Sequence, residues 1–295
     1  MTERRVDGVA GAAALTLCGT VDMRPTTPPL ARAYAPGAAG QIHYYDSLGE
    51  GPSVLLIHQS PTSAMDFCAV FPRLISGGFR VIALDLPGMG LSDAPAAPPR
   101  LPDFAAAALS VLDHAGVDAA HLVGHHTGAA VAVFAARNWP ARVMRVALYG
   151  VPAAPPEAMA ALWARIVPSE RAGGLFTPRD DGDHLASLYR RLAGPYGPAV
   201  ANRMVLSRLL CGPTLWFGHN AALTWDMRPD LKADRHPLCL ITHPGEMLHE
   251  YTLAARDLRP DARLAVLDVD TALAIDAAPD LWSAAVTGFL QGEDA

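Results

Sequence analysis

Short apolar runs recur along the chain and alternate with segments of helical spacing. Runs such as 53–58 (SVLLIH) and 79–85 (FRVIALD) are almost continuously apolar, which is typical of strands buried on both faces of a sheet. The predicted strands are 41–46, 53–58, 79–85, 120–124, 142–150, 237–242 and 263–269. The predicted helices are 63–76, 102–114, 127–138, a segment ending at 256, and 279–290. This alternation predicts an α/β fold with a mostly parallel, twisted sheet and helices on both faces.

The alternation of strands and helices stops between residues 153 and 234. This stretch is helical in pattern, interrupted by prolines and rich in Trp, Arg and His. We expect it to form a helical lid inserted between two parts of one core, residues 32–152 and 235–295. Residues 1–31 are expected to form an N-terminal extension.

Composition excludes several functional classes. The 295 residues carry a formal net charge of −6, and Lys232 is the only lysine. A nucleic-acid surface needs clustered Lys and Arg, and a Walker-type phosphate loop needs Gly-Lys-Ser/Thr, so neither is expected. The sequence also contains no dinucleotide fingerprint, flavin motif or metal-ligand spacing, and we expect no cofactor and no metal. A small-molecule substrate is the expected partner, with no membrane partner, and a homodimer is left open.

The cysteines and the N-terminus bear on the compartment. The four cysteines are widely separated and form no CxxC pair, as expected of buried thiols in a reducing compartment. Residues 8–21 follow Arg4 and Arg5 and resemble a signal-peptide core, but the run is too short to span a bilayer and Asp7 interrupts its basic flank. A loosely attached or helical extension is the expected alternative, and we expect a cytoplasmic protein.

Three motifs follow predicted strands in a fixed order. They are 56–61 (LIHQSP), 85–93 (DLPGMGLSD) and 124–128 (GHHTG), the last at a turn from strand to helix with Gly at both ends. Together they resemble the α/β-hydrolase fold superfamily, and the resemblance covers about residues 32–292. It implies a twisted parallel sheet covered by helices, with a lid over the active site.

The catalytic positions depart from the family pattern. The family's elbow is Gly-x-nucleophile-x-Gly with Ser, Asp or Cys at its tip, whereas His126 occupies the tip here. The family's catalytic His is expected seven residues before the proline that opens the last helix. Ala272 occupies that position, and no His follows Glu250. The chain is therefore identified as a divergent member without the ordinary Ser-His-Asp mechanism.

His126 is the expected catalytic group. The elbow implied by the resemblance would place its ring at the mouth of the cavity, at the N-terminus of the helix that begins at Thr127. The helix dipole there disfavours an imidazolium, so we expect a neutral ring that acts as a base or as a hydrogen-bond donor.

A carboxylate is expected to support this ring. The resemblance places the family's acid after the strand that ends near residue 242, where Glu246 fits best, and Asp270 and Asp276 are alternatives. A direct or water-bridged hydrogen bond between Glu246 and His126 would fix the tautomer of the ring and raise its basicity.

Further site residues follow from the resemblance and from the lid. The family's oxyanion hole is formed by backbone N–H groups that fall here on Gln59 and Thr127. His58 and Asp85 are expected to hold loops, and lid aromatic residues either line the pocket or form the lid's own core. The candidate pocket residues are His125, Ser60, His184, Trp216, His219, Trp225 and Asp270.

Three functional hypotheses remain open. The first is a cofactor-independent cyclase, isomerase or lyase of specialised metabolism, in which His126 is the acid or base for a small, largely apolar substrate. The second is a hydrolase of an activated ester, lactone or epoxide that uses water activated by His126. The third is a retired hydrolase that only binds a ligand. The first is expected, because hydrolysis by this fold normally relies on the missing nucleophile.

Overall fold

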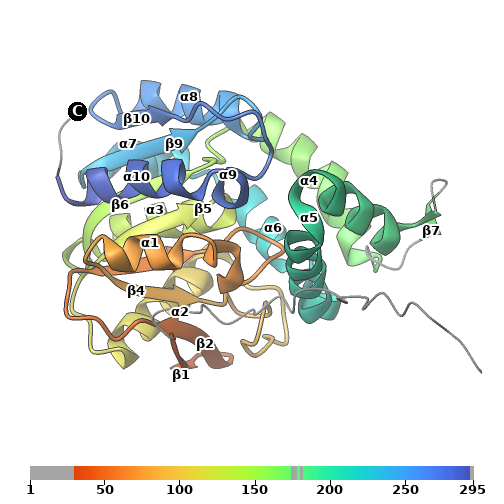
Figure 1. Ribbon diagram of the computed structural model, residues 1–295, viewed down its shortest axis with the longest axis horizontal. Coiled ribbons are helices and arrows are strands. Elements are labelled where there is room, and N and C mark those ends of the chain that lie inside the picture. The colour runs from red at the N-terminus through yellow and green to blue at the C-terminus, as the bar shows by residue number, and fades with distance from the viewer. Residues whose placement is uncertain (1–29, 174–177, 180–181, 293–295) are drawn as a thin grey trace, which may run out of the picture.

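The computed structural model describes residues 30–173, 178–179 and 182–292, so the extension expected for residues 1–31 lies almost wholly outside the described residues. An eight-stranded sheet has the order β1-β2-β4-β3-β5-β6-β9-β10 (Figure 1). Its strands are β1 (Ala31–Gly37), β2 (Gly40–Asp46), β3 (Ser53–Ile57), β4 (Arg80–Leu84), β5 (Ala120–His125), β6 (Val143–Tyr149), β9 (Leu238–Thr242) and β10 (Arg263–Val266). Strand β2 pairs antiparallel with β1 and β4, and all other pairs are parallel.

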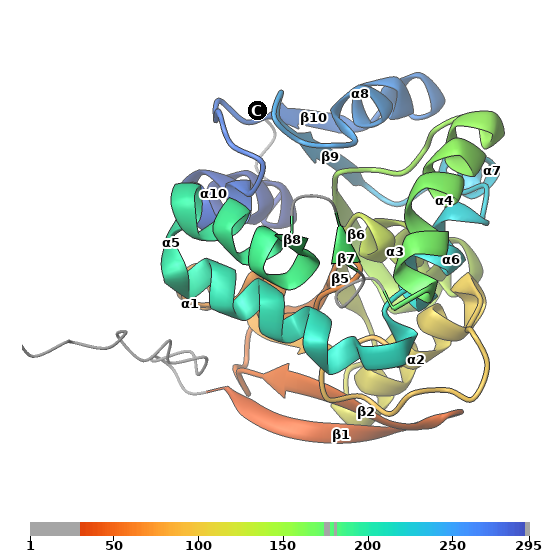
Figure 2. The same ribbon diagram turned by 90° about the vertical axis from the view of Figure 1, so that its right-hand side faces the viewer.

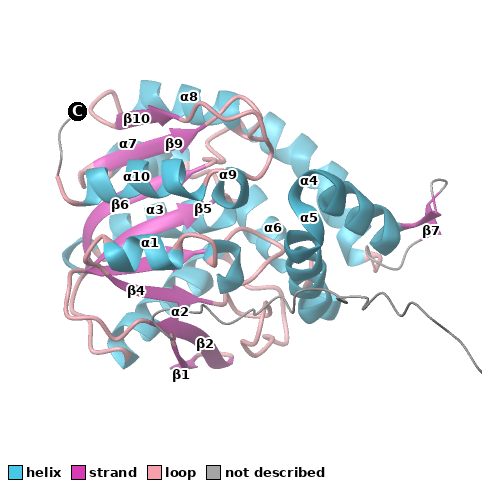
Figure 3. Cartoon of the chain, viewed as in Figure 1, coloured by secondary structure: helices cyan, strands magenta, loops and turns pink. Residues whose placement is uncertain are grey.

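Helices cover both faces of this sheet (Figure 3). The helices of the described residues are α1 (Phe71–Ser76), α2 (Leu101–His114), α3 (Thr127–Asn138), α4 (Pro156–Arg171), α5 (His184–Cys211), α6 (Phe217–Leu223), α7 (Arg228–Ala233), α8 (His249–Leu258), α9 (Ala274–Ala277) and α10 (Pro279–Leu290), of which α4 and α5 lie at the edge of the sheet and not on a face. The predicted α/β fold with a mostly parallel sheet is confirmed. Within the described ranges, no helix is long and apolar enough to cross a membrane.

Several elements differ from the sequence prediction. Strand β1 was not expected, because its exposure alternates and it has only one neighbouring strand, β2, so it lacks a continuous apolar run. The helix expected for 63–76 is a 3-10 turn at Ala64–Phe67 followed by α1, where Pro72 occupies the first turn. The stretch between β6 and β9 contains a small hairpin, β7 (Pro178–Arg179) and β8 (Gly182–Asp183), as well as helices.

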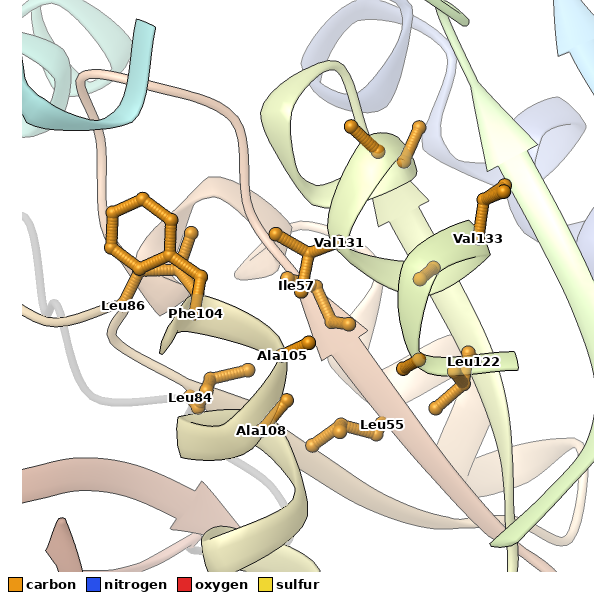
Figure 4. Packing of buried hydrophobic residues seen from close by; sticks show 14 of the residues in the cluster. Leu55, Ile57, Leu84, Leu86, Phe104, Ala105, Ala108, Leu122, Val131 and Val133 are labelled. Atoms are coloured by element: carbon orange, nitrogen blue, oxygen red, sulfur yellow. The ribbon is translucent and has the colours of Figure 1, made fainter. Parts of the chain in front are cut away.

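The core lies in two layers, one on each face of the sheet. Side chains alternate along β3, so Leu55 and Ile57 pack on one face with α2 and α3 (Figure 4). Val54 and Leu56 pack on the other face, against α1 and α10. Because both faces are buried, the strands show the continuous apolar runs seen in the sequence.

Helices α4 and α5 stand at the edge of the sheet toward which the parallel strands point (Figure 1). Figure 2 looks onto these helices, with α5 and α4 on either side of the ends of β5 and β6. Helix α5 is kinked at Gly197, which has φ 82° and ψ 165° and lies between Pro195 and Pro198. The loops that follow β3, β5, β6 and β9 meet at this covered edge, where ligands of open α/β sheets bind.

Candidate active site

His126 connects β5 to α3 in a strained backbone conformation. Its φ of 47° and ψ of −107° are unusual for a residue with a side chain and cost about 1–3 kcal/mol. The turn is held because the His126 amide donates to the Tyr149 carbonyl at 3.0 Å and the His126 carbonyl accepts from the Ala129 amide at 2.9 Å. A Cβ at Gly128 would lie 1.9 Å from the Ile57 carbonyl oxygen, so the helix needs glycine there to approach the sheet. The tight turn predicted from GHHTG is therefore present.

Glu246 and His126 form a direct hydrogen bond. The distance from His126 Nε2 to Glu246 Oε1 is 2.5 Å, and the Glu246 side chain is 2% exposed. The loop after β9 fixes the carboxylate, because the Leu248 amide donates to Glu246 Oε2 at 2.9 Å and the Glu246 amide donates to the His243 carbonyl. The sequence anticipated a direct or water-bridged contact, and the structure has the direct one.

The charge state of this pair determines which ring nitrogen is free. Burial opposes ionisation of Glu246, but the hydrogen bond and charge of His126 and the Leu248 amide outweigh it and lower the pKa of the carboxyl group. An ionised carboxylate only accepts, so Nε2 of His126 is the donor, and whenever the ring is neutral its lone pair is on Nδ1. His126 Nδ1 has no hydrogen-bond partner among the described residues and is not fully buried, and His126 lines a cavity.

Gly150 provides the space for this pair. It follows β6 with a φ of +63°, and a Cβ there would lie 2.3 Å from His126 Cδ2 and 3.0 Å from Glu246 Cδ. Any side chain at position 150 would displace the imidazole from the carboxylate.

A second histidine–carboxylate pair lies beside the first. His125 Nδ1 is 2.7 Å from Asp66 Oδ2, and the Gln59 side-chain amide donates to Asp66 Oδ1 at 3.1 Å. The rings of His125 and His126 are 4.4 Å apart between centroids. Burial lowers the pKa of His125, and the charge and hydrogen bond of Asp66 oppose this lowering. His125 therefore packs beside the elbow, as expected, and also lines the cavity.

Asp66 contributes to stability through its ionised form. Burial would raise its pKa, but the charge and hydrogen bond of His125 and the bond from Gln59 bring the pKa down to about 2 from 3.8. A lowered pKa stabilises the fold above the unfolded value, and this stabilisation is lost as the pH falls through the folded value. We expect Asp66→Asn to lower the free energy of unfolding at pH 7 by about 2 kcal/mol.

Chemical denaturation between pH 7 and pH 2 tests this expectation. The difference in the free energy of unfolding between wild type and Asp66→Asn should become smaller as the pH falls from about 4 to about 2. Asp257→Asn is the control, because Asp257 is exposed on α8 and has no ion pair among the described residues. If the free energies of unfolding of wild type and Asp66→Asn differ by the same amount at every pH, the contribution of Asp66 is not ionic.

The other two carboxylates considered as partners of His126 lie elsewhere. Asp276 lines the same cavity, but both of its oxygens are 2.6 Å from Arg203 Nη2, and burial raises its pKa. Asp270 is exposed and does not line the cavity. The structure therefore brings Glu246, and neither aspartate, into contact with the ring.

These groups surround a cavity of about 240 Å³. Its lining residues are Gln59, Asp66, His125, His126, Tyr149, Leu192, Met204, Arg208, Gly245, Glu246, Met247, Ala272, Leu273, Ala274, Ile275 and Asp276. Neither a Ser, a Thr nor a Cys is among them, so this wall offers no hydroxyl or thiol nucleophile of the kinds that acyl transfer uses. Within the described part of the chain, no cluster of His, Cys, Asp and Glu could hold a metal ion.

The residues whose backbone amides are expected to form the oxyanion hole lie at the start of α3 and in the cavity wall. Thr127 is the first residue of α3, so its amide is one of the helix's initial donors without an intrahelical acceptor. Gln59 lines the cavity, and its carbonyl accepts from His58 Nδ1 at 2.6 Å. His58 Nε2 in turn accepts from the Leu86 amide at 3.0 Å, which confirms the loop-holding function expected for His58.

Most other candidate pocket residues are placed away from His126. Ser60 is buried and donates to Met89 Sδ, and His219 Nδ1 is 2.9 Å from Glu170. The Trp216 ring lies under the Arg171 guanidinium, and Trp225 lines a separate cavity of about 360 Å³. Sequence spacing does not determine which face of a lid helix points to the core. The side chain of His184 lies outside the described residues.

Several cavity residues were not anticipated from the sequence, among them Asp66, Tyr149 and Arg208. Tyr149 ends β6, stacks against His125 with centroids 4.6 Å apart, and its hydroxyl lies 2.8 Å from His243 Nε2. Its position at the carboxyl end of a central strand was the available signal. Arg208 had no local signal, because arginines are frequent throughout the lid.

Comparison with known proteins gives matches over much of the chain. A family model described as alpha/beta hydrolase fold matches residues 52–234. The chain is 35% identical over 118 residues to a 2-hydroxy-6-oxononadienedioate/2-hydroxy-6-oxononatrienedioate hydrolase of Klebsiella pneumoniae subsp. pneumoniae, covering 39% of this chain and 41% of that protein. It is 31% identical over 122 residues to Bifunctional epoxide hydrolase 2 of Mus musculus, covering 40% of this chain and 21% of that protein. The matches thus span well under half of these relatives.

Among solved structures, the enol-lactonase from Burkholderia xenovorans LB400 is similar in fold. It superimposes with a TM-score of 0.72 over 88% of this chain and 100% of that chain, at 21% sequence identity. At this identity, the likeness concerns the fold alone.

Proposed function

Since the chain belongs to the α/β hydrolase fold family, we propose that it is a cofactor-independent enzyme in which His126, held by Glu246, is the general base. The reaction we propose is hydrolysis of a small activated lactone, ester or epoxide by water. The observation that carries this proposal is the 2.5 Å hydrogen bond between His126 Nε2 and Glu246 Oε1, which leaves Nδ1 without a partner among the described residues on a ring that lines the cavity.

The proposed reaction follows from the proton positions. Nδ1 of His126 takes a proton from water while the water oxygen bonds to the electrophilic carbon of the substrate. Glu246 stabilises the imidazolium that forms, as a carboxylate does beside an imidazole in a catalytic triad. The carbon–oxygen bond of the substrate breaks, its electrons remain on the leaving oxygen, and the imidazolium returns the proton to that oxygen. For a lactone or ester, the amides of Gln59 and Thr127 would stabilise the intermediate oxyanion.

Two observations favour water as the nucleophile. The cavity wall described above contains no Ser, Thr or Cys, and its three carboxylates are already hydrogen-bonded to His126, His125 and Arg203. The sequence relatives named above are hydrolases, one of them an epoxide hydrolase, which supports hydrolysis over the cyclase, isomerase or lyase reaction expected from the sequence.

A non-hydrolytic proton transfer is the second candidate function. The same free base without a neighbouring nucleophile would also abstract a proton from carbon or from a hydroxyl group. That reaction uses the same residues and differs in its product, which gains no water.

Isotopic labelling separates these reactions. The enzyme is incubated with a small-molecule extract of the source organism in H₂¹⁸O, and products and enzyme peptides are weighed by mass spectrometry. Direct hydrolysis predicts a product that has gained labelled water, while the peptides containing Asp66, Glu246 and Asp276 stay unlabelled after many turnovers. A label in one of these peptides would contradict direct attack by water, because it reports a covalent ester of that carboxylate. A product of unchanged mass would favour the second candidate.

A further inference from the structure

Arg208 brings a positive charge into the cavity from the lid. It lies on α5, is only partly exposed, and lines the cavity together with Leu192 and Met204 of the same helix. Other elements contribute His126 and Glu246 to the same cavity wall. The lid therefore presents one cation, on an otherwise apolar surface, to the catalytic pair.

The guanidinium of Arg208 is not neutralised by the protein. Among the described residues, no carboxylate oxygen lies within 4.0 Å of it, and the one hydrogen bond that it donates goes to the Met204 carbonyl at 3.4 Å. Burial lowers the pKa of Arg208 although the field of Glu170 raises it, yet an arginine stays protonated at physiological pH. A partly buried cation with one long hydrogen bond has most of its donors unused.

Every other ionised group in the cavity wall has a partner. Glu246 accepts from His126, Asp66 is paired with His125, and Asp276 is held by Arg203. Removing a charge from water without a partner is unfavourable, so an unpaired cation in a cavity favours a ligand that supplies the opposite charge. The guanidinium fork matches a carboxylate in a bidentate arrangement.

We infer that Arg208 binds an anionic group of the substrate, with a carboxylate as the best match, and so orients the reacting end toward His126. The three other ionised groups of the wall, Asp66, Glu246 and Asp276, are carboxylates and repel an anion, which makes Arg208 the site in this wall that attracts it. The inference rests on the proposed function only in assigning this cavity to the substrate, and it predicts selective binding whether or not His126 is catalytic.

Binding of a matched probe pair tests the inference. Benzoate and benzamide have nearly the same shape and differ in charge. Each is titrated into the full-length protein, and binding is followed by the NMR resonances of the histidine rings. We expect benzoate to bind wild type about 10- to 100-fold more tightly than benzamide, the ratio expected of one charge-assisted bond. Arg208→Met should remove this preference while leaving benzamide affinity unchanged, and Arg208→Lys should retain part of it.

Arg190→Met is the matched control. Arg190 lies on α5, donates to the carbonyl of Ala186 four residues earlier as Arg208 does to Met204, and is exposed outside the cavity. The Arg190→Met variant should keep the full preference for benzoate. This result would show that the loss of preference in Arg208→Met comes from the cavity and not from the change in net charge. Equal affinities for the two probes in wild type, no benzoate binding at millimolar concentration, or a preference retained in Arg208→Met would each overturn the inference. The His126→Asn variant should still bind benzoate more tightly than benzamide. Turnover by this variant tests the catalytic proposal separately, because activity that survives the substitution would contradict that proposal alone.

Discussion

Replacing His126 by Asn should lower kcat/KM for a converted metabolite by about 10² to 10⁴, the usual contribution of a general base. Asparagine tolerates positive φ better than most residues and has no basic lone pair, so it suits the strained elbow and removes only the chemistry. The measurement is the steady-state rate over a range of substrate concentrations, with the fold checked by circular dichroism.

A histidine outside the cavity provides the control for this substitution. His114 is near the end of α2, and its Nδ1 is hydrogen-bonded to the Tyr44 hydroxyl. His114→Asn should leave kcat/KM unchanged. Equal rates for wild type and His126→Asn would contradict the assignment of His126 as the base.

Gly150→Ala should separate His126 from Glu246 without altering either residue. The added Cβ would lie 2.5 Å from His126 Nε2, so the imidazole must move. We expect turnover to fall by about 10²-fold, since a misplacement near 1 Å has such an effect. The free energy of unfolding should fall by about 1–3 kcal/mol from overpacking, in addition to the backbone strain.

Gly116→Ala isolates the backbone contribution. Gly116 follows α2 with a φ of +67°, close to the +63° of Gly150, and a Cβ there would meet nothing within 4 Å. It should cost about 1–2 kcal/mol of stability and leave turnover intact. Equal stability and equal turnover of Gly150→Ala and Gly116→Ala would contradict the prediction that His126 and Glu246 need the space left by Gly150.

The fold and the catalytic pair could be predicted because their signals are local. Buried parallel strands need continuous apolar runs, and the turn at 124–128 needs glycine where α3 approaches β3. Glu246 follows a strand whose carboxyl end lies at the same sheet edge as the elbow, so its proximity to His126 followed from topology.

The rest of the site depends on contacts that no local pattern encodes. Asp66 meets His125 across 59 residues of sequence, and Arg203 meets Asp276 across 73. The orientation of the lid helices depends on their packing, which places His219 against Glu170 and not in the cavity. Arg208 is distinguished from other lid arginines only by what surrounds it.

The central claim is that His126 is the catalytic base, and its most direct test requires no knowledge of the substrate. A small-molecule extract of the source organism is incubated with wild type, His126→Asn and His114→Asn, and the three mixtures are compared by high-resolution mass spectrometry. We predict at least one compound that wild type and His114→Asn consume and that His126→Asn leaves unchanged. Equal consumption of that compound by all three proteins would contradict the claim.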